Sequence, residues 1–284
     1  MKKIAVVGAG TMGNGIAQVI AASGIDVLMT DINDAAVQRG VAAVAKSLDR
    51  LVAKQKLDES GKKAILGRIR TATRLDDVAG CDLVVEAATE NVELKLRIFA
   101  DLDRIAQPSA ILASNTSSIS LTRIAGATKR PAQVIGMHFF NPVPLMQLVE
   151  LIRALQTSDA TFDAVKALTL KVGKTPVEVR NSPGFVANRI LLPMLNEAVF
   201  CLHEGLASAE DIDTVMKLGM AHPMGPLALA DLIGLDTCLS ILEVLFDGFK
   251  DPKYRPCPLW REKVEAGHLG RKTGRGFFVY EGKK

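Results

Sequence analysis

Apolar positions follow two alternating patterns from the N-terminus to about residue 180. Runs typical of strands, which are short and β-branched or fully apolar, occupy residues 3–7, 26–30, 83–86, 110–113, 133–137, 146–151 and 175–179. Helical spacing fills the gaps between them at residues 12–22, 34–56, 60–68, 92–105 and 160–172. Strands that alternate with helices in this way indicate an α/β fold with a parallel, doubly wound sheet. The nearly continuous apolar strands favour helices on both faces of that sheet.

The pattern changes after Asn181-Ser182-Pro183-Gly184. Residues 185–250 are helical in pattern and have few strand signals. The chain has 284 residues, of which 48% are hydrophobic, so it is long enough for two modest domains and too apolar for disorder. We therefore predict a Rossmann-type domain over residues 1–183, with a helical excursion at about 34–68, followed by an all-helical C-terminal domain over 184–284.

A glycine-rich segment, Gly8-Ala9-Gly10-Thr11-Met12-Gly13, follows the first predicted strand and opens the first predicted helix. In a dinucleotide-binding turn the first glycine allows a tight bend, the second lets the backbone approach a pyrophosphate, and the third lets the helix pack on the strand. The exposed amides and the helix dipole then bind the phosphates. Asp31 stands at the end of the second predicted strand, 18 residues after Gly13. Its carboxylate accepts hydrogen bonds from ribose hydroxyls and repels a 2′-phosphate, and Ile32 rather than an arginine follows it, so NAD is favoured over NADP.

His138 and Glu150 are candidates for acid–base chemistry. His138 ends one apolar strand, and Glu150 lies within another. A carboxylate among apolar residues needs a polar partner, and the 12-residue spacing with a proline-containing turn lets neighbouring strands bring the two side chains together. A carboxylate on one ring nitrogen sets the tautomer and leaves the other nitrogen as a general base, which is the proton-transfer half of an alcohol oxidation. A structural histidine is the alternative.

Two further polar segments are consistent with ligand contacts or with local turn chemistry. Ser114-Asn115-Thr116-Ser117-Ser118 follows a predicted strand, at the edge where parallel strands point into a ligand crevice. The same residue types also form Asx and serine turns or helix caps. Asn188 follows a Pro-Gly pair at the start of the second domain, where it either reaches across a cleft or caps a helix.

The charge of the chain is concentrated in one segment. The net charge is +4, from 35 Lys and Arg and 31 Asp and Glu, but residues 39–74 alone carry ten basic and three acidic residues. That segment therefore has a net charge of +7 and the rest of the chain −3. On a helical wheel one face opposite an apolar stripe is formed by Arg39, Lys46, Ser47, Arg50 and Lys54. This face is either solvated or binds an anion, and the absence of interleaved aromatic residues disfavours nucleic acid.

The cysteines and the N-terminal segment bear on the compartment. The four cysteines, at 81, 201, 238 and 257, form no CxxC pair and match no zinc or disulfide framework, so we expect no metal. Residues 4–25 are uncharged after two lysines, as in a signal peptide, but glycines and polar residues interrupt the stretch. No later stretch is apolar and long enough to cross a bilayer. We expect a soluble, cytoplasmic protein that binds neither membranes nor nucleic acid.

Four ordered motifs together resemble the 3-hydroxyacyl-CoA dehydrogenase family. They are Ser-Asn-Thr-Ser-Ser at 114–118, His-Phe-Phe-Asn-Pro at 138–142, Pro-Gly-Phe-Val-Ala-Asn-Arg at 183–189 and Gly-Arg-Lys-Thr-Gly-Arg-Gly-Phe-Phe at 270–278. The resemblance extends over essentially the whole chain and is nearest to the family's stand-alone 3-hydroxybutyryl-CoA members. It implies NAD as cofactor, an acyl-CoA as substrate, and a homodimer formed through the C-terminal domain.

The resemblance also implies roles for individual residues. His138 matches the general base and Glu150 its orienting partner, while Ser117 and Asn188 match contacts to the 3-oxygen or the substrate carbonyl. On the basic face, Ser47 and Lys54 match positions that bind the coenzyme A 3′-phosphate and its neighbours, and Arg50 lies beside them. Further contacts at the cofactor end are implied for Glu90, Lys95, Asn115, Asn141 and Lys272.

These expectations combine into one reaction with two rivals. We expect reversible oxidation of an (S)-3-hydroxyacyl-CoA, with a short chain such as 3-hydroxybutyryl-CoA, to the 3-oxoacyl-CoA with NAD. A related branch that oxidises a sugar acid such as gulonate would use the same His–Glu chemistry but leave the basic face without a ligand. A non-catalytic, crystallin-like NADH-binding protein is the rival from another class, and the presence of Ser117, His138, Glu150 and Asn188 argues against it.

Overall fold

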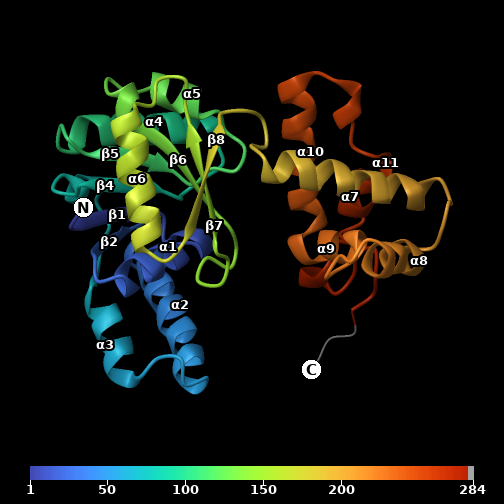
Figure 1. Ribbon diagram of the computed structural model, residues 1–284, viewed down its shortest axis with the longest axis horizontal. Helices are drawn as coiled ribbons and strands as arrows, with labels where there is room; N and C mark the ends of the chain where they lie inside the picture. Colours follow the sequence, from blue (N-terminus) through green and yellow to red (C-terminus); the bar gives the residue numbers. More distant parts are fainter. Residues whose placement is uncertain (281–284) are drawn as a thin grey trace. The chain divides into compact units, whose positions relative to one another are not determined.

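The computed structural model describes residues 1–280, and the chain divides into one compact unit over Met1–Ser182 and a second that begins at Pro183. The first unit contains eight strands in one sheet, ordered β3-β2-β1-β4-β5-β6-β7-β8 (Figure 1). The strands are β1 (Lys3–Val7), β2 (Asp26–Thr30), β3 (Ile69–Ala72), β4 (Leu83–Glu86), β5 (Ile111–Ser114), β6 (Val134–Phe139), β7 (Leu148–Arg153) and β8 (Thr175–Arg180). Strands β1 to β6 are parallel, whereas β7 pairs antiparallel with β6 and parallel with β8.

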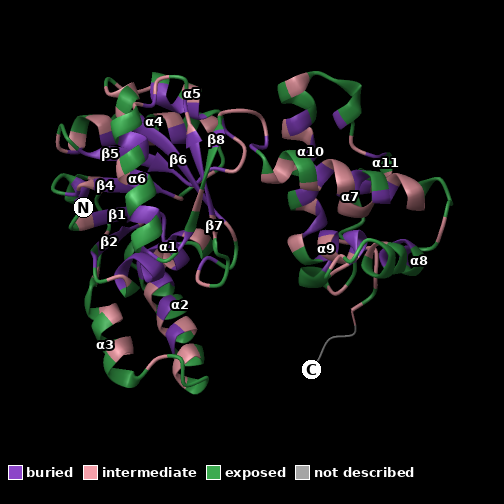
Figure 2. Cartoon of the chain, viewed as in Figure 1, coloured by how far each residue is buried: buried purple, intermediate pink, exposed green. Residues whose placement is uncertain are grey.

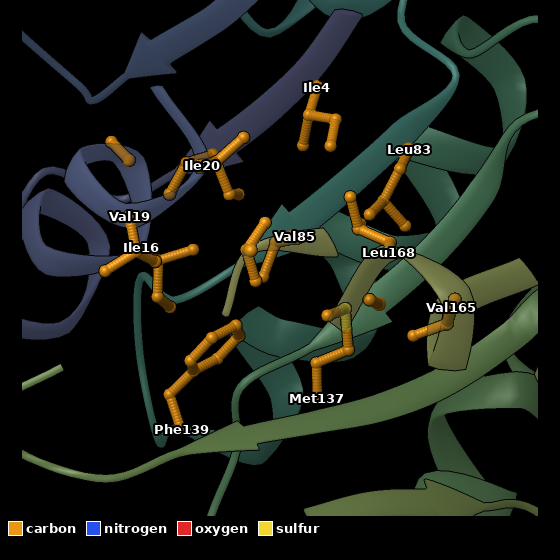
Figure 3. Close-up of a cluster of buried hydrophobic side chains, with 14 of the residues drawn as sticks. Ile4, Ile16, Val19, Ile20, Leu83, Val85, Met137, Phe139, Val165 and Leu168 are labelled. Carbon is orange, nitrogen blue, oxygen red and sulfur yellow. The ribbon is translucent and has the colours of Figure 1, made fainter. Parts of the chain in front are cut away.

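Helices of the first unit pack on this sheet because their apolar residues recur on one side. They are α1 (Thr11–Ala22), α2 (Asp34–Ala53), α3 (Glu59–Gly67), α4 (Val92–Ile105), α5 (Leu121–Gly126) and α6 (Asp159–Lys171). Figure 3 shows side chains of α1 and α6 packed on those of β1, β4 and β6 in one buried cluster. Figure 2 shows the central strands as almost entirely buried, as expected for a sheet covered on both faces. The predicted doubly wound fold class is therefore confirmed.

The helices α2 and α3 form the predicted excursion and lie side by side (Figure 1). Each begins with a side-chain cap, since Asn33 accepts a hydrogen bond from Ala36 N and Asp58 accepts one from Gly61 N. The predicted helix over 34–56 is too long by three residues. It ends at Ala53, because Gln55 adopts a left-handed conformation with φ of +56°, which a continuing helix does not allow.

Two elements of the first unit escape the apolar pattern. The strand β3 lies at the edge of the sheet, and its central residues Arg70 and Thr71 are exposed, so it lacks an apolar run. The helix α5 has only six residues, too few to show a period. Strand β6 also extends two residues beyond the predicted 133–137, so His138 is its second-last residue.

The second unit is helical, and within residues 183–280 its extended pairing is limited to two isolated bridges between residues 270 and 279. Its helices are α7 (Ala187–His203), α8 (Ala209–Thr214), α9 (Pro226–Ile233), α10 (Leu235–Phe249) and α11 (Pro258–Glu265). The buried carboxylate of Asp231 anchors the last described turn, accepting hydrogen bonds from Phe277 N, Phe278 N and the Tyr280 hydroxyl. Gly276 passes so close to this carboxylate that a Cβ there would lie 1.9 Å from Asp231 Oδ1.

Candidate active site

The glycine-rich turn connects β1 to α1, and two of its three glycines are required by contacts within the protein. Gly8 has φ of +102°, and a Cβ there would lie 2.6 Å from the carbonyl oxygen of Ala87. A Cβ on Gly13 would lie 1.7 Å from the carbonyl oxygen of Gly8, so only glycine lets the helix pack against the turn. A Cβ on Gly10, by contrast, would meet no atom within 4 Å. The open space at Gly10 is where a pyrophosphate approaches the backbone in this class of turn, so these residues fit a dinucleotide.

Asp31 follows β2 and is held against the glycine-rich turn. Its Oδ2 accepts a hydrogen bond from Ala9 N at 2.7 Å, and its Oδ1 accepts one from Ile32 N at 2.7 Å. Asp31 lines a cavity of about 260 Å³ together with Gly10 and Arg39. A fixed carboxylate in a cavity at the end of β2 suits the ribose of the adenosine half of NAD. Arg39 was expected on a solvated or anion-binding face, and its place beside Asp31 was not predicted from the sequence.

Glu86 ends β4 and organises the loop that follows. Its Oε1 accepts hydrogen bonds from Ala88 N and Thr89 N, and its Oε2 accepts one from the Ser114 hydroxyl. The same carboxylate is paired with the ammonium of Lys95, and both side chains are almost completely buried. Removing either partner would leave a buried, unpaired charge, so each side chain depends on the other. Glu86 thus holds the ammonium of Lys95 at the end of β4. The contact of Lys95 with the cofactor stays a prediction.

Glu90 holds the serine-rich turn after β5. Its carboxylate accepts hydrogen bonds from the Thr116 hydroxyl at 2.6 Å, from Ser117 N at 3.1 Å and from the Ser118 hydroxyl at 3.2 Å. Asn115 in turn accepts a hydrogen bond from Phe139 N at 2.9 Å, which ties this turn to the end of β6. The two predicted cofactor contacts, Glu90 and Asn115, therefore also fix the backbone around Ser117.

The side chains of His138 and Glu150 meet across β6 and β7. The two residues are direct partners in the antiparallel register, and His138 Nδ1 lies 2.8 Å from Glu150 Oε2. Both are buried, with 7% and 2% of their surfaces exposed. A carboxylate at this distance selects the tautomer with the proton on Nδ1 and makes Nε2 the nitrogen that takes up a proton. The ring of Phe140 packs on His138 with centroids 4.7 Å apart, which further restrains the imidazole.

Lys174 contacts the loop between β6 and β7 and was not predicted from the sequence. It lies just before β8, is 6% exposed, and donates hydrogen bonds to the carbonyl oxygens of Val143 and Met146 at 2.7 Å each. These carbonyls belong to the loop between β6 and β7, residues 140–147, which includes the exposed Asn141. The loop also presses on α1, since a Cβ at Gly15 would lie 2.8 Å from Val143 Cβ. Burial lowers the pKa of the Lys174 ammonium, and its two hydrogen bonds to carbonyl oxygens indicate that it holds this loop.

The predicted basic face of α2 is present around the end of that helix. Arg50 and Lys54 are exposed, Lys54 being the C-terminal cap, and Ser47 is half-buried. The nearby carboxylate of Asp49 is paired with Lys62 of α3. This pairing raises the pKa of Lys62. Asp49, the acidic residue next to Arg50 in the sequence, is therefore paired with α3.

Two sequence-predicted residues lie in the second unit. Asn188 is the second residue of α7 and is half-buried. Lys272 is exposed, and its ammonium contacts both carboxylate oxygens of Asp236 at 2.6 and 2.7 Å. Their contacts with substrate and cofactor stay predictions.

Comparison with known proteins agrees with this geometry. The NAD-binding domain of the 3-hydroxyacyl-CoA dehydrogenases matches residues 3–182, and the C-terminal domain of the same family matches residues 184–280. The chain therefore belongs to the 3-hydroxyacyl-CoA dehydrogenase family. It is an oxidoreductase that uses NAD, as the glycine-rich turn and Asp31 indicate.

Individual relatives cover the whole chain. A 3-hydroxybutyryl-CoA dehydrogenase of Bradyrhizobium diazoefficiens is 55% identical over 284 residues, which is 100% of this chain and 97% of that protein. A probable 3-hydroxybutyryl-CoA dehydrogenase of Bacillus subtilis is 56% identical and spans 100% of this chain and 99% of that protein. The crystal structure of (S)-3-hydroxybutyryl-CoA dehydrogenase from Ralstonia eutropha has a TM-score of 0.97 and 60% identity, covering 99% of this chain and 100% of its own.

The glycine-rich turn separates binding from folding in two substitutions. We expect Gly10→Ala to leave thermal unfolding unchanged but to raise the dissociation constant for NADH at least tenfold, because the added methyl group fills the open space at the turn. Gly13→Ala should instead lower the unfolding temperature or prevent folding, because its Cβ collides with Gly8 O. Fluorescence titration with NADH and a thermal scan measure the two effects. Gly67→Ala, also in open space but in α3, serves as the control, and wild-type NADH affinity in Gly10→Ala would contradict this assignment.

Lys174 should control the mobility of the loop between β6 and β7. The amides of Leu145 and Met146 donate to Pro142 O within this loop, so their hydrogen exchange reports its opening. We expect Lys174→Met to speed that exchange about tenfold or more, because two hydrogen bonds from a charged donor are lost. Lys171→Met, which removes an exposed lysine of α6, should leave the exchange unchanged. Equal protection in both variants would show that Lys174 does not hold the loop.

Proposed function

We propose that this chain is an NAD-dependent (S)-3-hydroxybutyryl-CoA dehydrogenase, which interconverts 3-hydroxybutyryl-CoA and acetoacetyl-CoA. The observation that carries the proposal is the buried pair of His138 and Glu150, 2.8 Å apart, in the same unit as the glycine-rich turn. The short-chain substrate is supported by the relatives at 55–60% identity, which are named for it. The reverse reaction uses the same groups, because the protonated His138 returns its proton to the 3-oxygen when 3-oxoacyl-CoA is reduced.

The protein's part in the reaction is to hold and move one proton. His138 Nε2 takes the proton of the substrate's 3-hydroxyl group, while Glu150 stabilises the imidazolium that results. Bound NAD supplies the acceptor for the hydride that leaves carbon 3. Ser117, on the turn fixed by Glu90, is assigned to donate its hydroxyl hydrogen bond to the 3-oxygen. Asn188 of the second unit stays a predicted substrate contact. The products are the 3-oxoacyl-CoA, NADH and one proton, so atoms and electrons balance.

The coenzyme A end of the substrate is assigned to the basic face. Arg50 and Lys54 are exposed and positively charged, and the hydroxyl of Ser47 lies on the same helix. Such charges attract a phosphorylated ligand at long range, and salt screens the attraction. A sugar acid without a phosphate would leave this face unused, so the basic face favours the CoA thioester over gulonate.

Replacement of His138 tests the chemistry. We expect His138→Ala to bind NADH as the wild type does but to reduce acetoacetyl-CoA with a kcat about 10²–10⁴-fold lower, which is what a positioned acid–base group contributes. Glu150→Gln should also lower kcat without changing NADH affinity, because its amide can present a donor to Nδ1 and select the wrong tautomer. His203→Ala removes an exposed histidine of α7 and should be fully active. A fully active His138→Ala variant, or one that fails to fold, would refute the catalytic role. The wild-type protein should not oxidise gulonate, which distinguishes this proposal from the sugar-acid alternative.

Replacement of Lys54 tests the CoA assignment. We expect Lys54→Ala to raise KM for acetoacetyl-CoA several-fold, an effect that shrinks at high salt, with kcat nearly unchanged. Turnover of an acetoacetyl thioester that lacks coenzyme A should be the same in wild type and variant. Lys63→Ala, which removes an exposed lysine of α3, is the matched control. Equal losses with both thioesters would show that Lys54 does not bind the coenzyme.

A homodimer through the second unit is part of the proposal. Exposed apolar side chains gather in one segment of that unit, Leu206, Val215, Leu218 and Met220, each at least 60% exposed. Apolar side chains clustered on a surface mark an interaction site more often than isolated ones do. We expect Leu218→Asp to shift the sedimentation coefficient from dimer to monomer. Leu155→Asp, which changes a residue 88% exposed in the first unit, should not. A wild-type monomer at micromolar concentration would contradict the proposal.

We also propose a cytoplasmic location. Cys81, Cys201, Cys238 and Cys257 are all free, and burial raises the pKa of the Cys238 thiol to about 12. Free cysteines are typical of a reducing compartment. No helix within residues 1–280 is long and apolar enough to cross a membrane.

A further inference from the structure

Arg39 lies on α2, the helix that follows Asp31, and lines the same cavity as that carboxylate. The cavity has a volume of about 260 Å³ and also includes Ala9 and Gly10 of the glycine-rich turn and Ala36 of α2. Arg39 stands in the second turn of α2, eight residues after Asp31. The helical pattern of α2 therefore does not by itself show that Arg39 and Asp31 line one cavity.

The two charged groups of this cavity are in different situations. Both oxygens of Asp31 already accept a backbone hydrogen bond, from Ala9 N and Ile32 N, so the carboxylate is held in place. The Arg39 side chain is exposed, and none of the ion pairs found within residues 1–280 involves its guanidinium. The cavity thus contains a fixed negative charge and a positive charge that forms no ion pair with a carboxylate of the described residues.

We propose that Arg39 is a second determinant of cofactor choice, a ready-made site for a 2′-phosphate that the charge of Asp31 keeps unused. A phosphate carries close to two negative charges, and a guanidinium can donate two parallel hydrogen bonds to it. With Asp31 ionised, the phosphate would be repelled by a carboxylate in the same cavity, so the neutral ribose of NAD is preferred. The proposal rests on the assignment of this cavity to the adenosine end of the dinucleotide.

The proposal differs from the general expectation that an acidic residue alone selects NAD. If Asp31 were the only determinant, removing its charge would relieve repulsion but create no attraction for a 2′-phosphate. With Arg39 already in the cavity, one substitution at Asp31 should turn a repulsive site into an attractive one. A stacking role of Arg39 on the adenine ring is the competing hypothesis, and it would affect nucleotides with and without a 2′-phosphate equally.

The test compares two ligands that differ only in the 2′-phosphate, adenosine 5′-monophosphate and adenosine 2′,5′-diphosphate. Their dissociation constants are measured by calorimetry with the full chain as wild type, Asp31→Asn, Arg39→Gln and the double variant, which form a double-mutant cycle. Asparagine at position 31 keeps one oxygen that can accept the hydrogen bond from Ala9 N. If thermal unfolding shows that Asp31→Asn is defective in folding, Asp31→Ser is used in its place. Arg97→Gln, which removes an exposed arginine of α4, controls for overall charge.

We expect Asp31→Asn to bind the 2′,5′-diphosphate at least tenfold more tightly than wild type, with a gain that declines as salt increases. Adding Arg39→Gln should remove most of that gain while changing the affinity for the 5′-monophosphate less than threefold. Asp31→Asn should also reduce acetoacetyl-CoA with NADPH faster than wild type does. Arg97→Gln should leave both affinities unchanged.

Three results would overturn the proposal, and they differ from one another. Equal diphosphate affinity in Asp31→Asn and the double variant would show that Arg39 does not bind the 2′-phosphate. Equal losses of both ligands in Arg39→Gln would assign Arg39 to the adenine ring instead. If Asp31→Asn alters neither affinity, the cavity is not the adenosine site, and that assignment fails together with the proposal. Such a result would leave the His138 chemistry untouched, because the kcat test does not depend on this cavity.

Discussion

The antiparallel pairing of β7 with β6 is the constraint on which the candidate active site depends. Every strand from β1 to β6 is parallel, and the reversal at β7 places Glu150 directly opposite His138. A shift of the register by one residue would turn one of these side chains to the other face of the sheet. The 2.8 Å contact between them therefore follows from strand pairing, and the buried apolar residues of both strands fix that pairing.

Carboxylates fix the loops that follow several of the parallel strands. Asp31, Glu86 and Glu90 each accept hydrogen bonds from backbone amides at the carboxyl ends of the parallel strands. Groups held in this way need little reorganisation when a ligand binds, which is how proteins make polar sites effective. Glu86 has the largest desolvation cost of the three, because it is buried with Lys95. Hydrogen bonds from the Ser114 hydroxyl and from two backbone amides offset that cost. Asp31 and Glu90, two residues that the sequence predicts as cofactor contacts, thus also hold backbone in place, as does Glu86, which was not predicted.

Periodicity and motif spacing predicted the fold class and the meeting of His138 with Glu150, because buried strands carry continuous apolar runs. Strand β3 was missed, since an exposed edge strand has no such run. No sequence pattern predicted the role of Lys174, because its side chain is held by backbone carbonyls about 30 residues away in the sequence. The helical wheel assigned Arg39 to the same face as Lys54, although the start of α2 lies beside Asp31 and its end does not. A wheel describes direction around a helix and not the neighbours along it.

The central claim is that one histidine and one nicotinamide act on the same carbon of a CoA thioester. A crystal structure with NAD and acetoacetyl-CoA bound tests it most directly. We predict that His138 Nε2 lies within hydrogen-bond reach of the 3-oxygen, at roughly 2.6–3.2 Å, with the nicotinamide on carbon 3 and the coenzyme phosphates beside Lys54. A thioester bound with its 3-oxygen away from His138, in an otherwise ordered complex, would contradict this claim.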